Sequence, residues 1–350
     1  MLAGGVGSTT SIQTGNRNYR MDNVRCVLIF LVVLGHLLDL SGHPRLVQLN
    51  ELIYSFHMPA FVFLTGCFAK FSPRKAVLSY LYPYCLMQVL YVLLYRLYMG
   101  QDQPFQFSLP HYTLWYLLAS AFYFVLIPLL QTKRGGVRIA MFAVSVAVAL
   151  AAGFDPHIEY RFTISRFLCF LPYFVAGYFW GHGTSEADPC ARLGRRGRIG
   201  LAAFAAVLLI AFETVILKSS RISLTALYHA GPYTASGTTW LHRLFLLLVG
   251  FTWVAFFLLA APNRKFPVFT KLGQNTLAIY LFHGFLVKII GNLGILPQNA
   301  VPRLALSLAI AAVIVLLFGN RIATAAAKWC LTGHWIGVLL DKRSKKKCIE

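Results

Sequence analysis

The chain has 350 residues, of which 58% are hydrophobic and only 12% are charged. That charged share is about half of what a soluble globular domain carries, which excludes an ordinary water-soluble fold. The formal net charge is +21, but the basic residues are spread among short segments between apolar runs. This pattern favours a membrane protein with basic loops over a protein that binds nucleic acid.

Apolar runs of the length that crosses a hydrocarbon core recur along almost the whole chain, separated by turn and breaker residues. We therefore expect an all-α polytopic membrane protein with about ten transmembrane helices, at 23–41, 52–69, 76–99, 113–131, 137–153, 164–182, 199–217, 239–261, 276–292 and 303–320. The first run is expected to be a retained helix, because no small-residue cleavage site follows it. A transmembrane domain over 23–325 would then lie between a cytoplasmic segment, 1–22, and a basic cytoplasmic tail, 326–350.

The distribution of basic residues predicts the orientation. If the N-terminus is cytoplasmic, 23 of the 32 Lys and Arg residues fall on the inner side, and the other 9 lie in outer loops or helix ends. The positive-inside rule then predicts that both termini face the cytoplasm. The basic run 342–347 is interpreted as a contact with lipid headgroups. Seven cysteines form no CxxC pair, so neither a disulfide framework nor a metal site is expected.

The first predicted helix carries ionisable groups on one face. Arg25 and His36 are eleven positions apart, about three helical turns, so both project from the same face with ~16 Å between them along the axis. The complete face reads Asp22, Arg25, Ile29, Val32, His36 and Asp39. Because lipid would not solvate these groups, the stripe is expected to face the interior of the bundle.

Further polar and aromatic groups are predicted at one depth in the outer half of the bundle. They are His57, Trp115, Arg166, Glu213, His242, Arg243, Tyr280 and His283. A single intramembrane histidine is more often a structural hydrogen-bonding residue. Several histidines and arginines with a glutamate at one depth instead favour a polar functional cavity.

The two groups of the first helix suit different steps of one reaction. Histidine titrates near neutral pH and can take a proton from a hydroxyl, as direct O-acylation by a thioester requires. Arginine binds phosphate, which suits a nucleotide at the cytoplasmic mouth. A CoA thioester held by its phosphates near Arg25 could therefore extend its pantetheine arm towards His36, while an acceptor enters from outside.

Several motifs, in order between residues 19 and 283, resemble the acyltransferase 3 family of bacterial membrane acyltransferases. They are Tyr19 to Arg25 leading into Val32 to His36, with ten residues between Arg25 and His36; Tyr54 to Phe61 with Thr65-Gly66; Leu114-Trp115-Tyr116-Leu117; Ser165-Arg166-Phe167 with Phe170 to Phe174 and Gly177-Tyr178; and Gly273 to Thr276 with Ile279 to His283. Within the family, the second block, Phe170 to Phe174 and Tyr228 to Tyr233 are similar to fucose 4-O-acetylase-like acetyltransferases.

The resemblance implies a protein of the bacterial inner or plasma membrane. It implies acetyl-CoA, or another acyl-CoA, as donor and a hydroxyl of a sugar or surface glycan as acceptor, without a metal. Arg25 and His36 match the family's essential pair. Some family members carry a fused extracytoplasmic esterase-like domain; none follows the last predicted span here, which favours direct transfer to the acceptor.

The candidate catalytic residues are His36, His57, Arg166 and Asp39. His36 is expected to act as general base, while a transient acyl-histidine and a structural role remain open. Asp39 could orient the His36 ring or cap the helix end. His57 could take part in catalysis or pack at the kink beside Pro59. Arg166 could polarise the thioester, contact the sugar, or pair structurally with Glu213 or Glu159.

The remaining candidates are binding residues. For the donor they are Arg25, Asp22, Lys70, Arg74 and Lys75, and for the acceptor they are Trp115, Glu213, Tyr233, Arg243, Tyr280 and His283. Trp115 and Tyr233 could instead be interfacial anchors. A transporter or flippase for a polar lipid or sugar is the rival function, and the absence of an inverted sequence repeat disfavours it.

Overall fold

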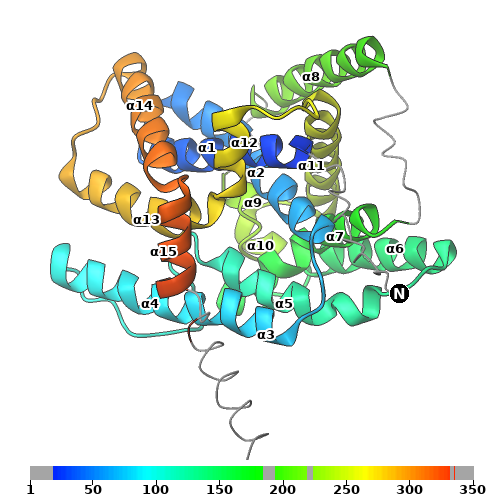
Figure 1. Ribbon diagram of the computed structural model, residues 1–350, viewed down its shortest axis with the longest axis horizontal. Coiled ribbons are helices and arrows are strands. Elements are labelled where there is room, and N and C mark those ends of the chain that lie inside the picture. The colour runs from blue at the N-terminus through cyan, green and yellow to red at the C-terminus, as the bar shows by residue number, and fades with distance from the viewer. Residues whose placement is uncertain (1–18, 184–193, 219–223, 332–334, 336–350) are drawn as a thin grey trace, which may run out of the picture.

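The computed structural model describes residues 19–183, 194–218, 224–331 and 335, and every regular element in them is helical (Figure 1). A helix covers each of the expected spans: α1 (Tyr19–Leu38), α2 (Pro44–Cys67), the continuous run α3 (Pro73–Ala76), η1 (Val77–Leu81), α4 (Tyr82–Leu93) and η2 (Leu94–Tyr98), then α5 (Trp115–Leu130), α6 (Gly135–Ala151), α7 (Ile164–Gly181), α8 (Arg195–Lys218), α11 (Trp240–Ala260), α13 (Thr276–Leu293) and α14 (Ala300–Phe318). Shorter helices lie between and after them: η3 (Arg161–Thr163), α9 (Leu224–Leu227), α10 (Tyr233–Ser236), α12 (Pro267–Gln274) and α15 (Arg321–Leu331).

Within the described residues, six helices are long and apolar enough to cross a membrane: Tyr19–Leu38, Pro73–Tyr98, Arg161–Gly181, Trp240–Ala260, Thr276–Leu293 and Ala300–Phe318. Two shorter apolar helices, Trp115–Leu130 and Gly135–Ala151, accompany them. Large apolar side chains are exposed along α8 and α14, among them Val207, Ile210, Val313 and Leu316. A bilayer solvates such surfaces, so the chain is a multi-pass membrane protein, as the composition predicted. The side of the membrane on which the termini lie stays a prediction.

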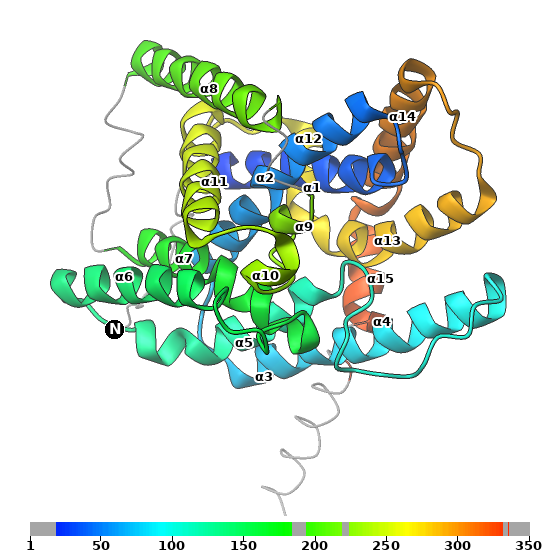
Figure 2. The same ribbon diagram turned by 180° about the vertical axis from the view of Figure 1, so that it is seen from behind.

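The first helix occupies the centre of the bundle. α1 packs against α2, α11, α12, α13 and α14, and both views show it crossing the middle of the molecule (Figures 1 and 2). Leu28, Val33 and Leu37 are fully buried on its apolar side. Burial of apolar side chains between helices leaves the opposite, polar side of α1 to face whatever space the bundle encloses.

Polar side chains fix the N-terminal end of α1. The side-chain amide of Asn23 donates to the carbonyls of Pro262 (3.0 Å) and Arg264 (2.9 Å), and its oxygen accepts from the Thr270 hydroxyl (2.7 Å). These bonds tie α1 to the connection between α11 and α12. Since Asn23 lies two positions before Arg25, they also fix the start of the polar stripe.

α15 extends the bundle beyond the last predicted span. The helix packs against α13 and α4, and the expected boundary between transmembrane domain and tail, at residues 325 and 326, falls inside it. Most of the rest of the predicted tail, including the basic run 342–347, lies outside the described residues.

The α2–α7 interface depends on glycines that allow close backbone approach. A Cβ at Gly177 would lie 2.0 Å from the Phe63 carbonyl oxygen, one at Gly181 2.1 Å from that of Cys67, and one at Gly66 2.2 Å from that of Phe174. Small residues at this four-residue spacing are typical of helix pairs in membranes.

We expect Gly177→Ala to destabilise the protein by about 1–3 kcal/mol, because the added methyl group must push two backbones apart. A Cβ at Gly136, near the start of α6, meets no heavy atom within 4 Å, so Gly136→Ala is the matched control. Thermal unfolding of both variants in the same detergent is the measurement. Equal melting temperatures for the two variants would contradict this account of the interface.

Candidate active site

Two cavities lie end to end along the polar face of α1. The first, of about 410 Å³, is lined by Arg25, Ile29 and Val32 from this helix, and we name it the Arg25 cavity. The second, of about 320 Å³, is lined by Val32, His36 and Asp39, and we name it the His36 cavity. Five of the six residues of the predicted stripe, Arg25 to Asp39, therefore face these cavities, whereas Asp22 is buried and lines neither of them.

Four side chains line both cavities and form a neck between them: Val32, Met58, Tyr116 and Tyr280. The Tyr280 hydroxyl donates to the Thr113 carbonyl (2.7 Å), and the Tyr116 hydroxyl is hydrogen-bonded to the Thr65 hydroxyl. The tyrosines are therefore fixed by hydrogen bonds, whereas Met58 has an unbranched side chain that can change rotamer readily.

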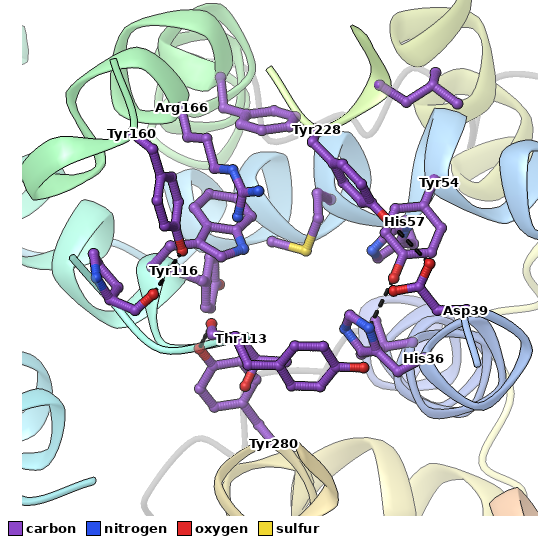
Figure 3. Close-up of a pocket in the computed structure, with 17 residues that line it drawn as sticks. His36, Asp39, Tyr54, His57, Thr113, Tyr116, Tyr160, Arg166, Tyr228 and Tyr280 are labelled. Carbon is purple, nitrogen blue, oxygen red and sulfur yellow. Dashed lines mark hydrogen bonds between the residues drawn. The ribbon is translucent and has the colours of Figure 1, made fainter. Parts of the chain in front are cut away.

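The His36 ring is held by aromatic neighbours from three other parts of the chain. Figure 3 shows the one from α2, Tyr54, hydrogen-bonded to the ring. Its Nδ1 lies 2.7 Å from the Tyr54 hydroxyl oxygen. The ring centroid lies 4.7 Å from that of Tyr112 and 5.5 Å from that of His283, which is stacked on it. These contacts restrain the ring and leave Nε2 as the nitrogen with no partner in the described structure.

His57 and His283 have fixed tautomers. Nδ1 of His57 lies 2.8 Å from the Ile53 carbonyl, and Nδ1 of His283 lies 2.8 Å from that of Tyr280. A carbonyl only accepts, so Nδ1 carries the proton and Nε2 keeps its lone pair in each neutral ring. His57 lines the His36 cavity, while His283 is completely buried behind the ring of His36.

Asp39 lines the His36 cavity but does not take the orienting role that the sequence suggested. Its carboxylate accepts from the Tyr228 hydroxyl (2.9 Å) and the Asn50 amide (3.3 Å), whereas Nδ1 of His36 has Tyr54 as its partner. The reason lies in helix geometry: Tyr54 reaches His36 from the facing helix α2, and Asp39 sits at the exposed end of α1.

Arg166 lines the same cavity with its guanidinium among aromatic rings. Its Cζ lies 4.5 Å from the ring centroid of Tyr160, 4.9 Å from that of Trp115 and 5.7 Å from that of Tyr228. Its Nε is buried without a hydrogen-bond partner, and no carboxylate of the described residues pairs with it. The structure thus gives no support for pairing with Glu159. A buried guanidinium without a counter-ion favours a ligand that brings negative charge.

The backbone ahead of Arg166 is strained. Phe162 and Thr163, with φ of 51° and 57°, adopt left-handed conformations directly before α7. Non-glycine residues in this region cost of order 1–3 kcal/mol each and cluster at functional sites. Here the strained turn sets the start of α7, and with it the position of Arg166 in the first helical turn.

The Arg25 cavity is positively charged. Arg25, Lys75 and Lys328 line it, and no aspartate or glutamate of the described part of the chain does. Arg25 lies 3.7 Å from Asp22 and packs with its Cζ 4.2 Å from the centroid of the Phe68 ring. Asp22 lies behind, where it accepts from the Gln274 amide (3.0 Å). The lining therefore suits an anionic ligand.

The structure places some predicted binding residues elsewhere. Lys70 and Arg74 are exposed and do not line the Arg25 cavity. Arg243 donates to the carbonyls of Ala149 (3.0 Å) and Gly231 (3.1 Å), and Tyr233, which lies beneath it, donates to that of Leu150 (2.7 Å). Neither residue lines the His36 cavity, because their polar atoms satisfy backbone carbonyls.

Of two further predicted residues, His242 does not line the His36 cavity. His242 takes part in the capping box of α11 through Thr239. The side chain of Glu213 lies outside the part of the structure that is described.

Sequence reasoning missed several tyrosines that shape the His36 cavity, namely Tyr54, Tyr112, Tyr160 and Tyr228. One signal was present: Tyr54 lies three positions before His57, the helical spacing that places two side chains on one face. Lys328 was also missed, because the sequence assigned it to the tail. Tyr228 also begins a segment that carries the family resemblance. No local pattern located Tyr112 or Tyr160, since their loops reach the cavity only in the fold.

Comparison with known proteins identifies the family of this chain. The acyltransferase domain of the acyltransferase 3 family matches residues 18–319, a range that contains both cavities except for Lys328. No curated protein and no solved structure matches the chain. Because the match covers most of the 350 residues, the chain belongs to the acyltransferase 3 family and is a membrane acyltransferase.

Proposed function

We propose that this protein moves an acetyl group from cytoplasmic acetyl-CoA to a hydroxyl of a sugar or surface glycan on the outer side of the membrane. The observation that carries the proposal is the pair of cavities along α1, one lined by Arg25 and the other by His36, which share the neck residues. A donor and an acceptor can therefore approach one reaction centre from opposite sides of the protein.

The Arg25 cavity is the proposed donor end. CoA carries several phosphate charges, and Arg25, Lys75 and Lys328 supply positive charge without a competing carboxylate in the lining. Lys70 and Arg74, exposed on the segment before and within α3, would add long-range attraction for the anionic donor.

The neck is the proposed passage for the pantetheine arm. This arm is thin and unbranched, and Met58 is the flexible member of the neck. Arg25 and His36 lie ~16 Å apart along the helix axis, so an extended arm that starts at Arg25 delivers the thioester to the His36 cavity. Trp115 and Tyr280 in that cavity offer aromatic faces against which a sugar ring can pack.

The proposed chemistry is one direct transfer. With Nδ1–H of His36 donating to the Tyr54 oxygen, Nε2 keeps its lone pair and accepts the proton of the acceptor hydroxyl as its oxygen attacks the thioester carbon. A C–O bond forms, the C–S bond breaks, and the proton on His36 passes to the departing CoA thiolate. The Arg166 guanidinium stabilises the oxyanion that develops on the acyl group.

His36→Ala should reduce acetyl transfer from acetyl-CoA to an acceptor glycan by at least about a hundredfold, because the general base is lost. Release of free CoA by purified protein in detergent, followed with a thiol reagent, measures both transfer and hydrolysis. The melting temperature of the variant serves as the control for folding. Full activity in a folded His36→Ala protein would refute the assignment of the base.

Tyr54→Phe tests the positioning of the ring. We expect kcat to fall about tenfold with little change in KM for acetyl-CoA, because the imidazole loses the partner that fixes Nδ1 while the donor site is intact. A change in KM alone would argue that Tyr54 contacts substrate instead.

Arg25→Ala should raise the Kd for CoA about tenfold or more, since one charge-assisted phosphate contact is lost. Arg134→Ala removes an exposed arginine at the start of α6 and is the matched control. Equilibrium binding of CoA to each purified variant is the measurement. An equal effect of the two substitutions would contradict the placement of the donor.

A further inference from the structure

A third cavity, of about 490 Å³, lies outside the two already described. It is lined by Leu40 and Gly42 directly after α1, by the end of η2 and the residues that follow it, by the last turns of α13, and by the connection between α13 and α14 with the start of α14. In both views the far end of the α4 run and the α13–α14 connection lie on the same side of the molecule (Figures 1 and 2). In the predicted orientation this is the outer side, from which an acceptor would come.

The lining of this cavity is built for an anion. Two cationic residues, Lys288 and Arg303, line it together with three amide side chains, Gln101, Asn292 and Gln298. No aspartate or glutamate is among the lining residues. Cations and amide donors without a carboxylate give a positive potential and a set of hydrogen-bond donors for a negatively charged group.

The two cations are not equivalent. Arg303 is 6% exposed, and its terminal nitrogens donate to the carbonyls of Pro297 (3.0 Å) and Leu40 (2.6 Å). Its buried Nε has no partner in the described structure. Lys288 is half-buried, and its Nζ lies 4.3 Å from the centroid of the Tyr112 ring. It forms no ion pair with a carboxylate of the described residues, although Asp39 is near enough to attract it electrostatically.

This difference selects the kind of anion. Carboxylates are recognised best by a free guanidinium fork that binds both oxygens, and the fork of Arg303 is already used by carbonyls. A lysine ammonium is a point charge that serves phosphate well, and the amides can bind further phosphate oxygens. The donors that remain therefore fit a phosphate better than a carboxylate.

Tyr112 separates this cavity from the reaction centre. Lys288 lies against its ring, and the ring centroid lies 4.7 Å from that of His36. The backbone of Tyr112 is left-handed, with φ of 48°, and its buried hydroxyl has no hydrogen-bond partner among the described residues. Because no hydrogen bond of the described residues holds this hydroxyl, the Tyr112 ring can turn without breaking one.

We propose that the third cavity binds the phosphate of a sugar-phosphate acceptor, with the sugar directed past Tyr112 towards His36. That the bound sugar phosphate is the acceptor rests on the proposed function, but its binding can be measured without acyl transfer. The phosphate could belong to a soluble sugar phosphate or to a sugar carried on a lipid phosphate, since both present the same group to Lys288.

The test is equilibrium binding to the purified full-length protein in nanodiscs. Four probes are compared: glucose 1-phosphate, polyprenyl-phosphate-linked glucose, glucose and glucuronate. We expect one or both phosphorylated probes to bind about tenfold or more tightly than glucose and than glucuronate. Preference for the lipid-linked probe identifies a membrane carrier, and preference for glucose 1-phosphate identifies a soluble acceptor.

Variants locate the site. Lys288→Gln should remove the tighter binding of the phosphorylated probes, and Lys288→Arg should keep most of it. The control Lys265→Gln, which removes an exposed lysine of the α11–α12 connection, should leave the affinities unchanged. His36→Ala should still bind the phosphorylated probes, so failure of the catalytic assignment and failure of this site give different results.

Three outcomes would overturn the proposal. They are equal binding of phosphorylated and neutral probes, tighter binding of glucuronate than of either phosphate, and equal effects of Lys288→Gln and Lys265→Gln on a folded protein.

Discussion

The polar stripe of α1 has to be solvated inside a helical bundle whose outer helices expose apolar side chains. Ionisable side chains cannot face lipid without a large cost, so the helices around α1 leave two cavities along this face, while apolar side chains pack against much of the rest of the helix. The rest of the site follows from this constraint. α2, α7 and α13 are placed where they supply His57, Arg166 and Tyr280, and the glycines between α2 and α7 keep these helices close enough to do so.

The charges of the three cavities have a common sign. Arg25 lines the Arg25 cavity, Arg166 the His36 cavity and Lys288 the third cavity. Among the described residues, no aspartate or glutamate lines the Arg25 cavity or the third cavity. Among the described residues, Asp39 is the one acid that lines the His36 cavity, and its carboxylate accepts hydrogen bonds from Tyr228 and Asn50. Positive charge in the lining of all three cavities favours ligands that bring negative charge, as CoA and a phosphorylated acceptor would.

Much of this could be predicted from the sequence because the governing signals are local. Hydropathy located the helices, and the spacing of Arg25 and His36 on one helix predicted a shared face. Contacts between distant segments carried no such signal. The partner of His36 is Tyr54 and not the predicted Asp39, because Tyr54 comes from the facing helix. Arg243 does not line the predicted cavity, because its guanidinium donates to backbone carbonyls nearby. The third cavity, formed by three separate chain segments, could be found only in the fold.

The central claim is that donor and acceptor meet through one passage along α1. The most direct measurement is a structure of the full-length protein in nanodiscs with a non-hydrolysable thioether analogue of acetyl-CoA. The account predicts that the phosphates lie against Arg25 and Lys75 and that the acyl carbonyl lies beyond the neck, in the His36 cavity. An analogue bound away from Arg25, or one whose acyl group stays below a neck packed shut by Met58 and Tyr116, would contradict it.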